Sequence, residues 1–348
     1  PAGSVPAGGK GRLQTLGRLT HGKIAQLAGV SQATVSKALN GNADIGEATR
    51  KKILKIAEEN GYFDQKKTAR KSLGKHCRPY IAIVVPEIIS LNFAKEATML
   101  VRLLASADID GRIYLSGFEE DEYNSTIENL LKSDYADGII SFSGTKPRKN
   151  VTVPFVCINQ FGVDLPYNLV SSNIGGGIRT AIRHLTALGH ERIGFIGETN
   201  TLMKEELFVS VMKESGLDPG SIYSNECRFE ACGHNGILKM LDSQKLYPTA
   251  LICAYDEIAY GAINELKLYG YSVPGDFSVI GMNDVAFSRV MDPGLTTVVL
   301  HSDVMCAEAV KLLCDSIHGE QGAAKHIEVQ CDLTVRKSTS VPRKEIII

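Results

Sequence analysis

From Tyr80 onward the sequence alternates short apolar runs with longer amphipathic stretches, and this rhythm restricts the possible folds more than any other feature. The expected strands are the apolar runs at 80–85, 112–116, 138–142, 154–158, 192–196, 249–253 and 277–281. Helical stretches lie between them, among others at 96–107, 175–189 and 257–270. Strands that alternate with helices are typical of doubly wound parallel sheets. About 270 residues of this α/β pattern predict two such lobes, with a cleft between the carboxyl ends of the strands.

The segment before this region has helical periodicity and predicts a small all-α domain. Three short helices are expected at 21–28, 32–40 and 47–61. Thr20 and Ser31 are suited to cap the first two helices, and Gly29 can adopt the positive φ of a tight turn between them. The side chains expected to form the core are Ile24, Leu27, Ala28, Val30, Val35, Ala38, Leu39, Ile53, Ile56 and Ala57. Two helices joined by a tight turn and followed by a third predict a helix-turn-helix.

The charge of the chain is divided unevenly. Residues 1–76 contain 14 Lys and Arg but only 5 Asp and Glu, a net charge of +9, whereas the remainder carries a net charge of −10. A basic head on an acidic body suggests a polyanion as partner. No apolar run approaches the roughly 18 residues of a membrane span, and the N-terminal segment has no apolar secretory signal. We therefore expect a cytoplasmic protein without a membrane partner.

The spacing of the cysteines and the absence of known motifs argue against a metal site, a bound cofactor and an enzymatic activity. The eight cysteines form no C-x-x-C pair, and several lie in apolar runs, so we expect buried free thiols and no metal site. No G-x-G-x-x-G motif follows the first strand, and neither G-x-S-x-G nor H-E-x-x-H occurs. The glycines at 175–177 lack the Lys-Ser/Thr of a phosphate loop. We expect no cofactor and no catalytic residues.

These patterns divide the chain into five parts. The expected segments are a disordered arm at 1–19, a helix-turn-helix domain at 20–63, a basic linker at 64–78, a two-lobed module at 79–340 and a tail at 341–348. The tail contains no leucine heptad, which favours a homodimer over a tetramer.

Several segments, in order, resemble the lac repressor / gal repressor family of bacterial transcription regulators. In the head these are KIAQLAGVSQATVSKALNG (23–41) and TRKKILKIAEENGY (49–62). In the body they are YADGIISFS (135–143), VSSNIGGGIRTAIRHLTALGHERIGFIGE (170–198), GYSVPGDFSVIGMNDV (270–285) and DPGLTTV (292–298). The resemblance implies a repressor with a periplasmic-binding-protein-like body whose chain crosses three times between lobes. We place the near lobe at about 79–170 plus 302–325 and the far lobe at about 171–300 plus 326–340.

The resemblance also implies that the second helix enters the major groove of a near-palindromic operator. Gln32, Ala33 and Lys37 match the family's base-reading positions, and these side chains suit adenine, a thymine methyl and guanine. The hydroxyl and amide groups expected to contact DNA phosphates are those of Thr20, Ser31, Thr34, Ser36 and Asn40. A purely structural capping role for Thr20 and Ser31 is the alternative.

The linker departs from the family pattern at 62–73, YFDQKKTARKSL, where the usual Pro and Asn are missing. Ala69 and Arg70 match the family's hinge, and Leu73 is the candidate wedge for the minor groove, although it stands one residue later than usual. The alternative is a linker leucine that packs on the body.

The resemblance further implies a pocket between the lobes for a sugar-like or nucleobase effector. The positions assigned to it are Phe93, Asn159, Phe161, Lys204, Phe229, Tyr255, Asp256 and Asn283. Asn159 and Asn283 stand where an acid is common, while Lys204 stands where an arginine is usual. Two lost carboxylates beside a retained cation predict an anionic effector, such as a phosphorylated sugar or a sugar acid.

Three other interpretations of the chain remain. A regulator could bind DNA without any effector, an enzyme could use the same body fold, or the body could be a transport binding protein. The basic head and the missing signal peptide argue against transport, and the missing motifs argue against an enzyme. Effector control would act through a population shift, in which a bound molecule favours one placement of the lobes.

Overall fold

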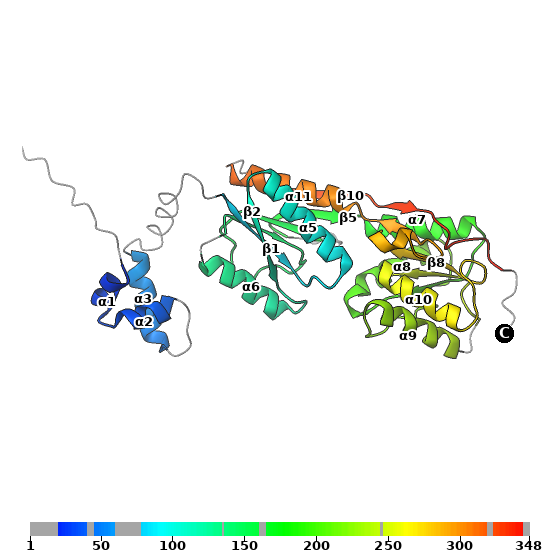
Figure 1. Cartoon of the computed structure of the whole chain (residues 1–348), viewed down its shortest axis with the longest axis horizontal. Coiled ribbons are helices and arrows are strands. Elements are labelled where there is room, and N and C mark those ends of the chain that lie inside the picture. Colours follow the sequence, from blue (N-terminus) through cyan, green and yellow to red (C-terminus); the bar gives the residue numbers. More distant parts are fainter. Residues whose placement is uncertain are drawn as a thin grey trace, which may run out of the picture. The chain divides into compact units, whose positions relative to one another are not determined.

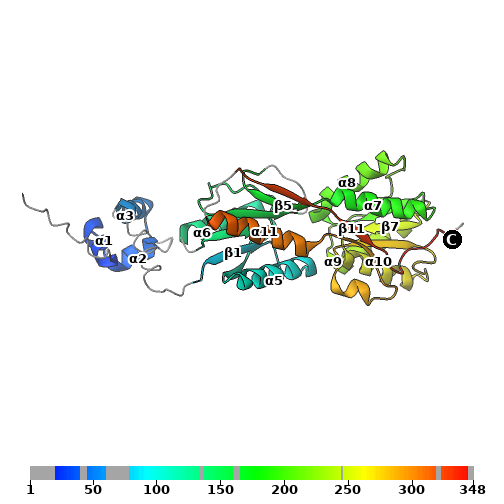
Figure 2. The same ribbon diagram turned by 90° about the horizontal axis from the view of Figure 1, so that it is seen from above.

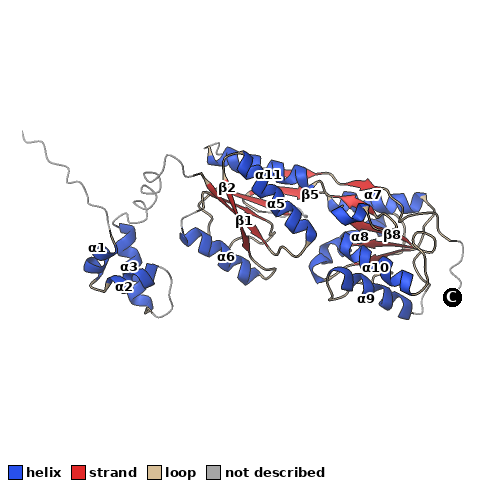
Figure 3. Ribbon diagram, viewed as in Figure 1, coloured by secondary structure: helices blue, strands red, loops and turns tan. Residues whose placement is uncertain are grey.

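The computed structural model describes residues 20–39, 45–59, 78–133, 136–159, 165–243, 246–318 and 323–343. Within them the contacts divide the chain into two compact units between Arg78 and Pro79. The first unit contains the N-terminal helices, and the second contains two lobes with strands between layers of helices (Figures 1 and 3). No helix of these ranges is both long and apolar enough to cross a membrane.

The first unit is a helix-turn-helix, as predicted. Its helices are α1 (His21–Ala28), α2 (Gln32–Leu39) and α3 (Glu47–Glu59). Thr20 caps α1 by accepting a hydrogen bond from the backbone of Lys23, and Gly29 ends the helix at φ 71°. The core residues are Ile24, Ala25, Ala28, Val35, Ala38, Ile53 and Ala57. The prediction for Leu27 was wrong, because the turn of α1 places Ala25 in the core and leaves Leu27 47% exposed.

The near lobe is a six-stranded parallel sheet in the order β10-β5-β4-β3-β1-β2. The strands are β1 (Tyr80–Val85), β2 (Asp110–Leu115), β3 (Gly138–Ser141), β4 (Phe155–Asn159), β5 (Asn168–Ser172) and β10 (His326–Val329). Successive residues of β1 face opposite sides of the sheet. Ile81 and Ile83 pack on α5 (Leu91–Ser106) and α11 (Ser302–Ile317), whereas Ala82 and Val84 pack on α6 (Glu120–Ser133). Figure 2 shows these helices and strands from above.

The far lobe repeats this plan with five strands in the order β11-β9-β8-β7-β6. The strands are β6 (Ile193–Ile196), β7 (Ala250–Cys253), β8 (Ser278–Met282), β9 (Thr296–Val299) and β11 (Asp332–Thr334), of which β11 alone is antiparallel to its neighbour. The helices are α7 (Ile174–Ala187), α8 (Leu202–Glu214), α9 (Phe229–Asp242) and α10 (Asp256–Leu268), with short 3₁₀ turns at η1 (Thr199–Thr201) and η2 (Ala286–Arg289). The doubly wound fold class is therefore confirmed.

The chain crosses between the lobes three times, and one of the predicted boundaries was wrong. β5 lies wholly in the near-lobe sheet, so the first crossing follows Ser172, close to the predicted boundary at about 170. The segment from residue 326 was assigned to the far lobe, yet β10 pairs in parallel with β5. The third crossing therefore lies at 330–331. The pairing of β10 with β5 thus assigns this segment to the near lobe. The sequence did not reveal the assignment, because the segment has only four residues and little apolar character.

The cysteines are free thiols in the described ranges. Cys157, Cys232, Cys253 and Cys306 are buried, as predicted, whereas Cys227 is exposed and Cys314 and Cys331 are half-buried. No group of three or more His, Cys, Asp or Glu side chains in these ranges could hold a metal ion.

In the far lobe α9 and α10 pack backbone against backbone. A Cβ atom on Gly261 would lie 2.0 Å from the carbonyl oxygen of Glu230, and one on Gly233 would lie 2.0 Å from that of Ile258. No side chain fits there without moving a helix, so these two glycines fix the distance between α9 and α10.

We predict that Gly261→Ala lowers the free energy of unfolding by about 3 kcal/mol, because the methyl group has no space. The control is Gly175→Ala in α7, whose Cβ would be 3.5 Å from its nearest side chain. Removing a helical glycine there stabilises the protein by up to about 1 kcal/mol. Urea unfolding followed by circular dichroism measures both changes, and equal effects would contradict the proposed close packing.

A buried histidine, His190, holds the C-terminal segment. His190 Nδ1 contacts Thr249 Oγ1 at 2.7 Å, and Nε2 contacts the carbonyl oxygen of Ser340 at 2.9 Å. Burial lowers the pKa of His190 below its ordinary value of 6.5. The folded chain thus binds fewer protons than the unfolded chain as the pH falls, so this stabilisation is complete above pH 6.5 and is lost below it.

We therefore expect the melting temperature to fall more steeply between neutral and mildly acidic pH in the wild-type chain than in His190→Gln, which cannot titrate. Differential scanning calorimetry across that range provides the test, and parallel pH profiles would refute the role given to His190.

Candidate functional site

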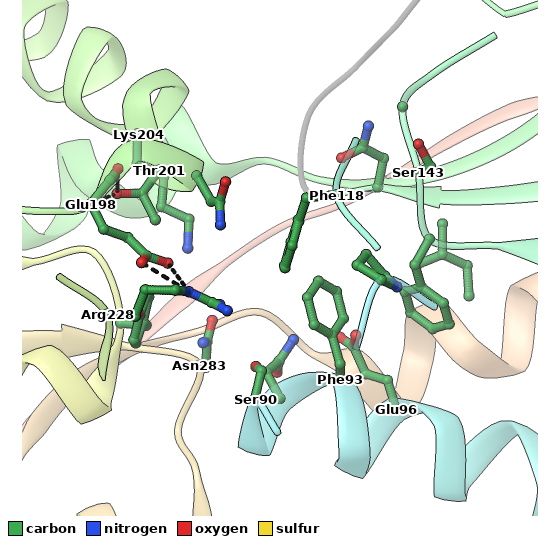
Figure 4. Close-up of a pocket in the computed structure, with 18 of the residues that line it drawn as sticks. Ser90, Phe93, Glu96, Phe118, Ser143, Glu198, Thr201, Lys204, Arg228 and Asn283 are labelled. Atoms are coloured by element: carbon green, nitrogen blue, oxygen red, sulfur yellow. Dashed lines mark hydrogen bonds and ion pairs between the residues drawn. The ribbon is translucent and has the colours of Figure 1, made fainter. Parts of the chain in front are cut away.

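A cavity of about 280 Å³ lies between the carboxyl ends of the two sheets (Figure 4). The near lobe supplies Pro86, Ser90, Asn92, Phe93, Glu96, Gly117, Phe118, Phe142, Ser143, Gly144, Ile158, Asn159 and Met305. The far lobe supplies Glu198, Asn200, Thr201, Lys204, Arg228, Phe229, Tyr255 and Asn283. Its position is that of a ligand site in doubly wound proteins, because loops follow the strands at this edge.

The near-lobe wall is aromatic. The ring of Phe93 lies 6.4 Å from that of Phe118 and 6.0 Å from that of Phe142, with tilted or edge-on geometry. On the far-lobe side the rings of Phe229 and Tyr255 are also 6.0 Å apart. Such rings offer apolar faces on which a flat or weakly polar ligand surface can pack.

The far-lobe wall is charged, and Arg228 is at its centre (Figure 4). Arg228 Nε donates to Glu198 Oε2 at 3.0 Å, while Nη1 and Nη2 donate to the two carboxylate oxygens of Glu87, each at 2.7 Å. These hydrogen bonds, above all that to Glu87, raise the pKa of Arg228 above its ordinary value. The positive charge of Arg228 is therefore matched by carboxylates of the protein itself.

Lys204 is buried beside the same wall. Its Nζ donates to the carbonyl oxygen of Ala254 at 2.9 Å, and the side chain is only 3% exposed. Burial lowers the pKa of Lys204 to about 8, against the opposing effect of Glu257 and Asp256. The ammonium group thus remains mostly charged at neutral pH and lies close to carboxylates.

Several polar groups of the lining have unused hydrogen-bonding capacity. Among the described side chains, Asn92 and Asn283 Oδ1 are buried without a hydrogen-bond partner. Asn283 has a φ of 99° and Phe229 a φ of 54°, values that L-residues with such side chains rarely adopt. Strained backbone of this kind is often found where a ligand is held. Buried amides without partners suit a ligand that both donates and accepts hydrogen bonds.

The structure places six of the predicted effector residues around the cavity: Phe93, Asn159, Lys204, Phe229, Tyr255 and Asn283. Their contact with a ligand stays a prediction. Phe161 lies outside the described residues.

Asp256 does not line the cavity. Its carboxylate accepts hydrogen bonds from Val285 N, Ser288 Oγ and Thr297 Oγ1 and is fully buried, so it fastens the segments after β8 and within β9 to α10. Burial raises the pKa of Asp256 to about 7.

The cavity also contains carboxylates, at positions that the sequence did not indicate. Glu96 and Glu198 both line it, and Ser302 Oγ donates to Glu96 Oε1 at 2.7 Å. Burial raises the pKa of Glu96 above its ordinary value. The described lining thus contains two acidic and two basic side chains, and its formal charges balance.

Sequence reasoning missed Arg228, Glu198 and Phe118. Each follows a strand or precedes a helix at the carboxyl edge of a sheet. This position in the strand–helix alternation is the sequence signal that could have identified them as cavity residues. Glu198 comes two residues after β6, and Arg228 immediately precedes α9.

The second candidate surface is the exposed side of α2. Gln32, Ala33 and Lys37 are exposed, while Val35 and Ala38 face the core. The Ser31 hydroxyl accepts a hydrogen bond from Thr34 N at 3.0 Å and lies 2.8 Å from Thr34 Oγ1, so Ser31 is a cap. Ser36 is half-buried. The capping roles of Thr20 and Ser31 leave both residues exposed and do not exclude phosphate contacts. The predicted contacts Asn40, Ala69, Arg70 and Leu73 lie outside the described residues.

Known proteins share this combination of domains. Residues 22–65 match the family of bacterial regulatory proteins, lacI family, and residues 182–339 match the periplasmic binding protein-like domain. The HTH-type transcriptional repressor CytR of Escherichia coli is 28% identical over 331 residues, which cover 91% of this chain and 95% of CytR.

Two solved structures share the fold. The lac repressor dimer bound to operator and the anti-inducer ONPF has a TM-score of 0.69 at 21% identity and covers 92% of this chain and 99% of its own. The complex of the transcriptional regulator CelR with cellobiose has a TM-score of 0.66 at 23% identity, covering 92% of this chain and 100% of its own. The chain thus combines a lacI-family DNA-binding domain with a periplasmic-binding-protein-like body, which is the domain combination of transcription regulators of the LacI/GalR family.

Proposed function

We propose that this regulator represses transcription as a cytoplasmic homodimer at a near-palindromic operator, and that a small sugar-like molecule in the cleft controls its affinity for that operator. The observation that carries the effector role is the cavity between the lobes, with its aromatic wall and its buried polar atoms without partners. A regulator without an effector would have no need to keep such groups buried, since each costs about 1–3 kcal/mol. The lac repressor structure, a dimer on its operator, supports the dimeric arrangement.

The charges of the cleft favour a neutral effector over the anionic one that the sequence suggested. Arg228 already binds two carboxylates, and Lys204 donates to a backbone carbonyl close to Glu257. An anionic group would have to displace these partners and would also meet Glu96 and Glu198. Hydroxyl groups, in contrast, can donate to the carboxylates and exchange hydrogen bonds with Asn92 and Asn283. The cellobiose complex of CelR is consistent with a neutral sugar.

Control would follow from a population shift between two placements of the lobes. Both lobes line the cavity, while the chain crosses between them at only three points. A ligand that contacts both walls therefore favours the placement in which both walls reach it. In a dimer such a change alters how the two heads meet their half-sites.

We expect neutral sugars to bind more tightly than their phosphorylated counterparts. Isothermal titration of the full chain with matched pairs, for example cellobiose and ribose against their phosphates, measures both affinities under one buffer and ionic strength. Tighter binding of the phosphorylated member would overturn the neutral class and restore the anionic one. Absence of heat and of thermal stabilisation across a broad metabolite screen would remove the effector role.

The base-reading proposal is tested on α2 after selection of an operator from a random duplex library. Lys37→Ala and Gln32→Ala should each weaken operator binding by about 1–3 kcal/mol and reduce the preference for operator over random DNA. Lys51→Ala is the matched control, because Lys51 is an exposed lysine of α3 that pairs with Glu47. Fluorescence anisotropy measures all three variants. Equal losses for Lys37→Ala and Lys51→Ala would indicate charge attraction alone and would contradict base reading.

A further inference from the structure

The contact between Arg228 and Glu87 joins the two lobes. Arg228 belongs to the far lobe, immediately before α9, whereas Glu87 follows β1 in the near lobe. Both outer nitrogens of the guanidinium bind the carboxylate at 2.7 Å, in the paired geometry that gives arginine–carboxylate bridges their strength and direction. The contact therefore ties the lobes directly across the cleft, away from the three crossings of the chain.

The surroundings hold the guanidinium in place. Its third nitrogen position binds Glu198 in the far lobe at 3.0 Å, and its central carbon lies 5.1 Å from the ring centre of Phe118 in the near lobe. The side chain of Glu87 is 13% exposed and that of Arg228 is 32% exposed. Shelter of this degree reduces screening by water and salt compared with an ordinary surface pair. A second cross-lobe hydrogen bond, from Leu91 N to Glu257 Oε1, is longer at 3.3 Å.

The bridge consists of protein groups alone, so it needs no charge from a ligand. It also fills the two nitrogens of Arg228 that would otherwise be free to bind a carboxylate or phosphate in the cleft. One residue, Glu87, thus bears on both the position of the lobes and the class of molecule that the cleft accepts.

We propose that Glu87 and Arg228 form a latch that holds the two lobes together across the effector cleft, and that Glu87 thereby denies Arg228 to anionic ligands. The second part of the proposal rests on the proposed effector role of the cleft. The first part does not, because closure of the lobes can be measured without effector or DNA.

The test compares two substitutions that each remove one carboxylate from Arg228. Glu87→Gln removes the partner on the opposite lobe, whereas Glu198→Gln removes the partner on the same lobe and leaves the bridge intact. Hydrogen exchange of the full chain, without DNA or sugar, is followed by mass spectrometry in the segments 86–92 and 226–230. We expect about tenfold faster exchange in Glu87→Gln, the effect of losing a charge-assisted hydrogen-bonded pair, and near wild-type exchange in Glu198→Gln.

Wild-type protection in Glu87→Gln, or an equal change in both variants, would overturn the latch. Should Glu87→Gln fold poorly, as judged by circular dichroism, Arg228→Lys serves as the second variant. It keeps the positive charge but lacks the paired nitrogens. Faster exchange in the same segments of Arg228→Lys would support the latch, and unchanged exchange would refute it.

Inorganic phosphate tests the second part. Thermal unfolding is measured in millimolar phosphate and in chloride of equal ionic strength. We expect phosphate to raise the melting temperature of Glu87→Gln but not that of the wild type or of Glu198→Gln. Equal stabilisation of all three chains, or of none, would contradict the selectivity role. These outcomes are separate from failure of the proposed function, which would appear as loss of sugar or operator binding in the wild-type chain.

Discussion

Parallel strand pairing determines where this molecule can hold a small ligand, because it brings the carboxyl ends of the strands in each lobe to one edge. In the near lobe all six strands are parallel, and in the far lobe only β11 runs the other way. The loops that follow β1, β3, β6 and β7 consequently meet in one place and form the cavity. The two walls differ in chemistry, since one presents phenylalanine rings and the other presents Glu198, Lys204 and Arg228.

The ligand preference of the cleft also depends on the pairing of its charged side chains with groups of the protein itself. From the sequence Lys204 looks like an anion-binding group, but in the fold it donates to the carbonyl of Ala254, and the neighbouring Arg228 binds Glu87 and Glu198. Buried charges are stabilised only when they are paired and hydrogen-bonded, and pairing within the protein reduces what remains for a ligand. Hydroxyl groups gain from such a setting because they can join existing networks without adding charge.

Periodicity predicted much of the fold, because the long strand–helix alternation and the three head helices leave strong sequence patterns. The observed ends of α1, α2 and β1 agree with the predicted ends to within one residue. Periodicity failed for β10, whose lobe is determined by long-range strand pairing. It also failed for Leu27 and Ala25, because the rotation of α1 about its axis determines which of the two is buried. Family resemblance located six cavity residues, but it could not distinguish Tyr255, which faces the cavity, from Asp256, whose carboxylate turns away to hold Val285, Ser288 and Thr297. Adjacent residues at a helix start point in different directions, and only the fold reveals which one faces the ligand.

The contact of α9 with α10 has a consequence for how this protein can move. Because Gly233 and Gly261 bring the two backbones together without side chains between them, the helices have no layer on which to slide. The segment that carries Arg228 and Phe229 at the start of α9 is thus coupled rigidly to Tyr255 at the start of α10. The part of the far wall that α9 and α10 carry is therefore expected to move as one unit. A response to a bound molecule then favours rotation at the three chain segments that join the lobes, a hinge motion rather than a shear.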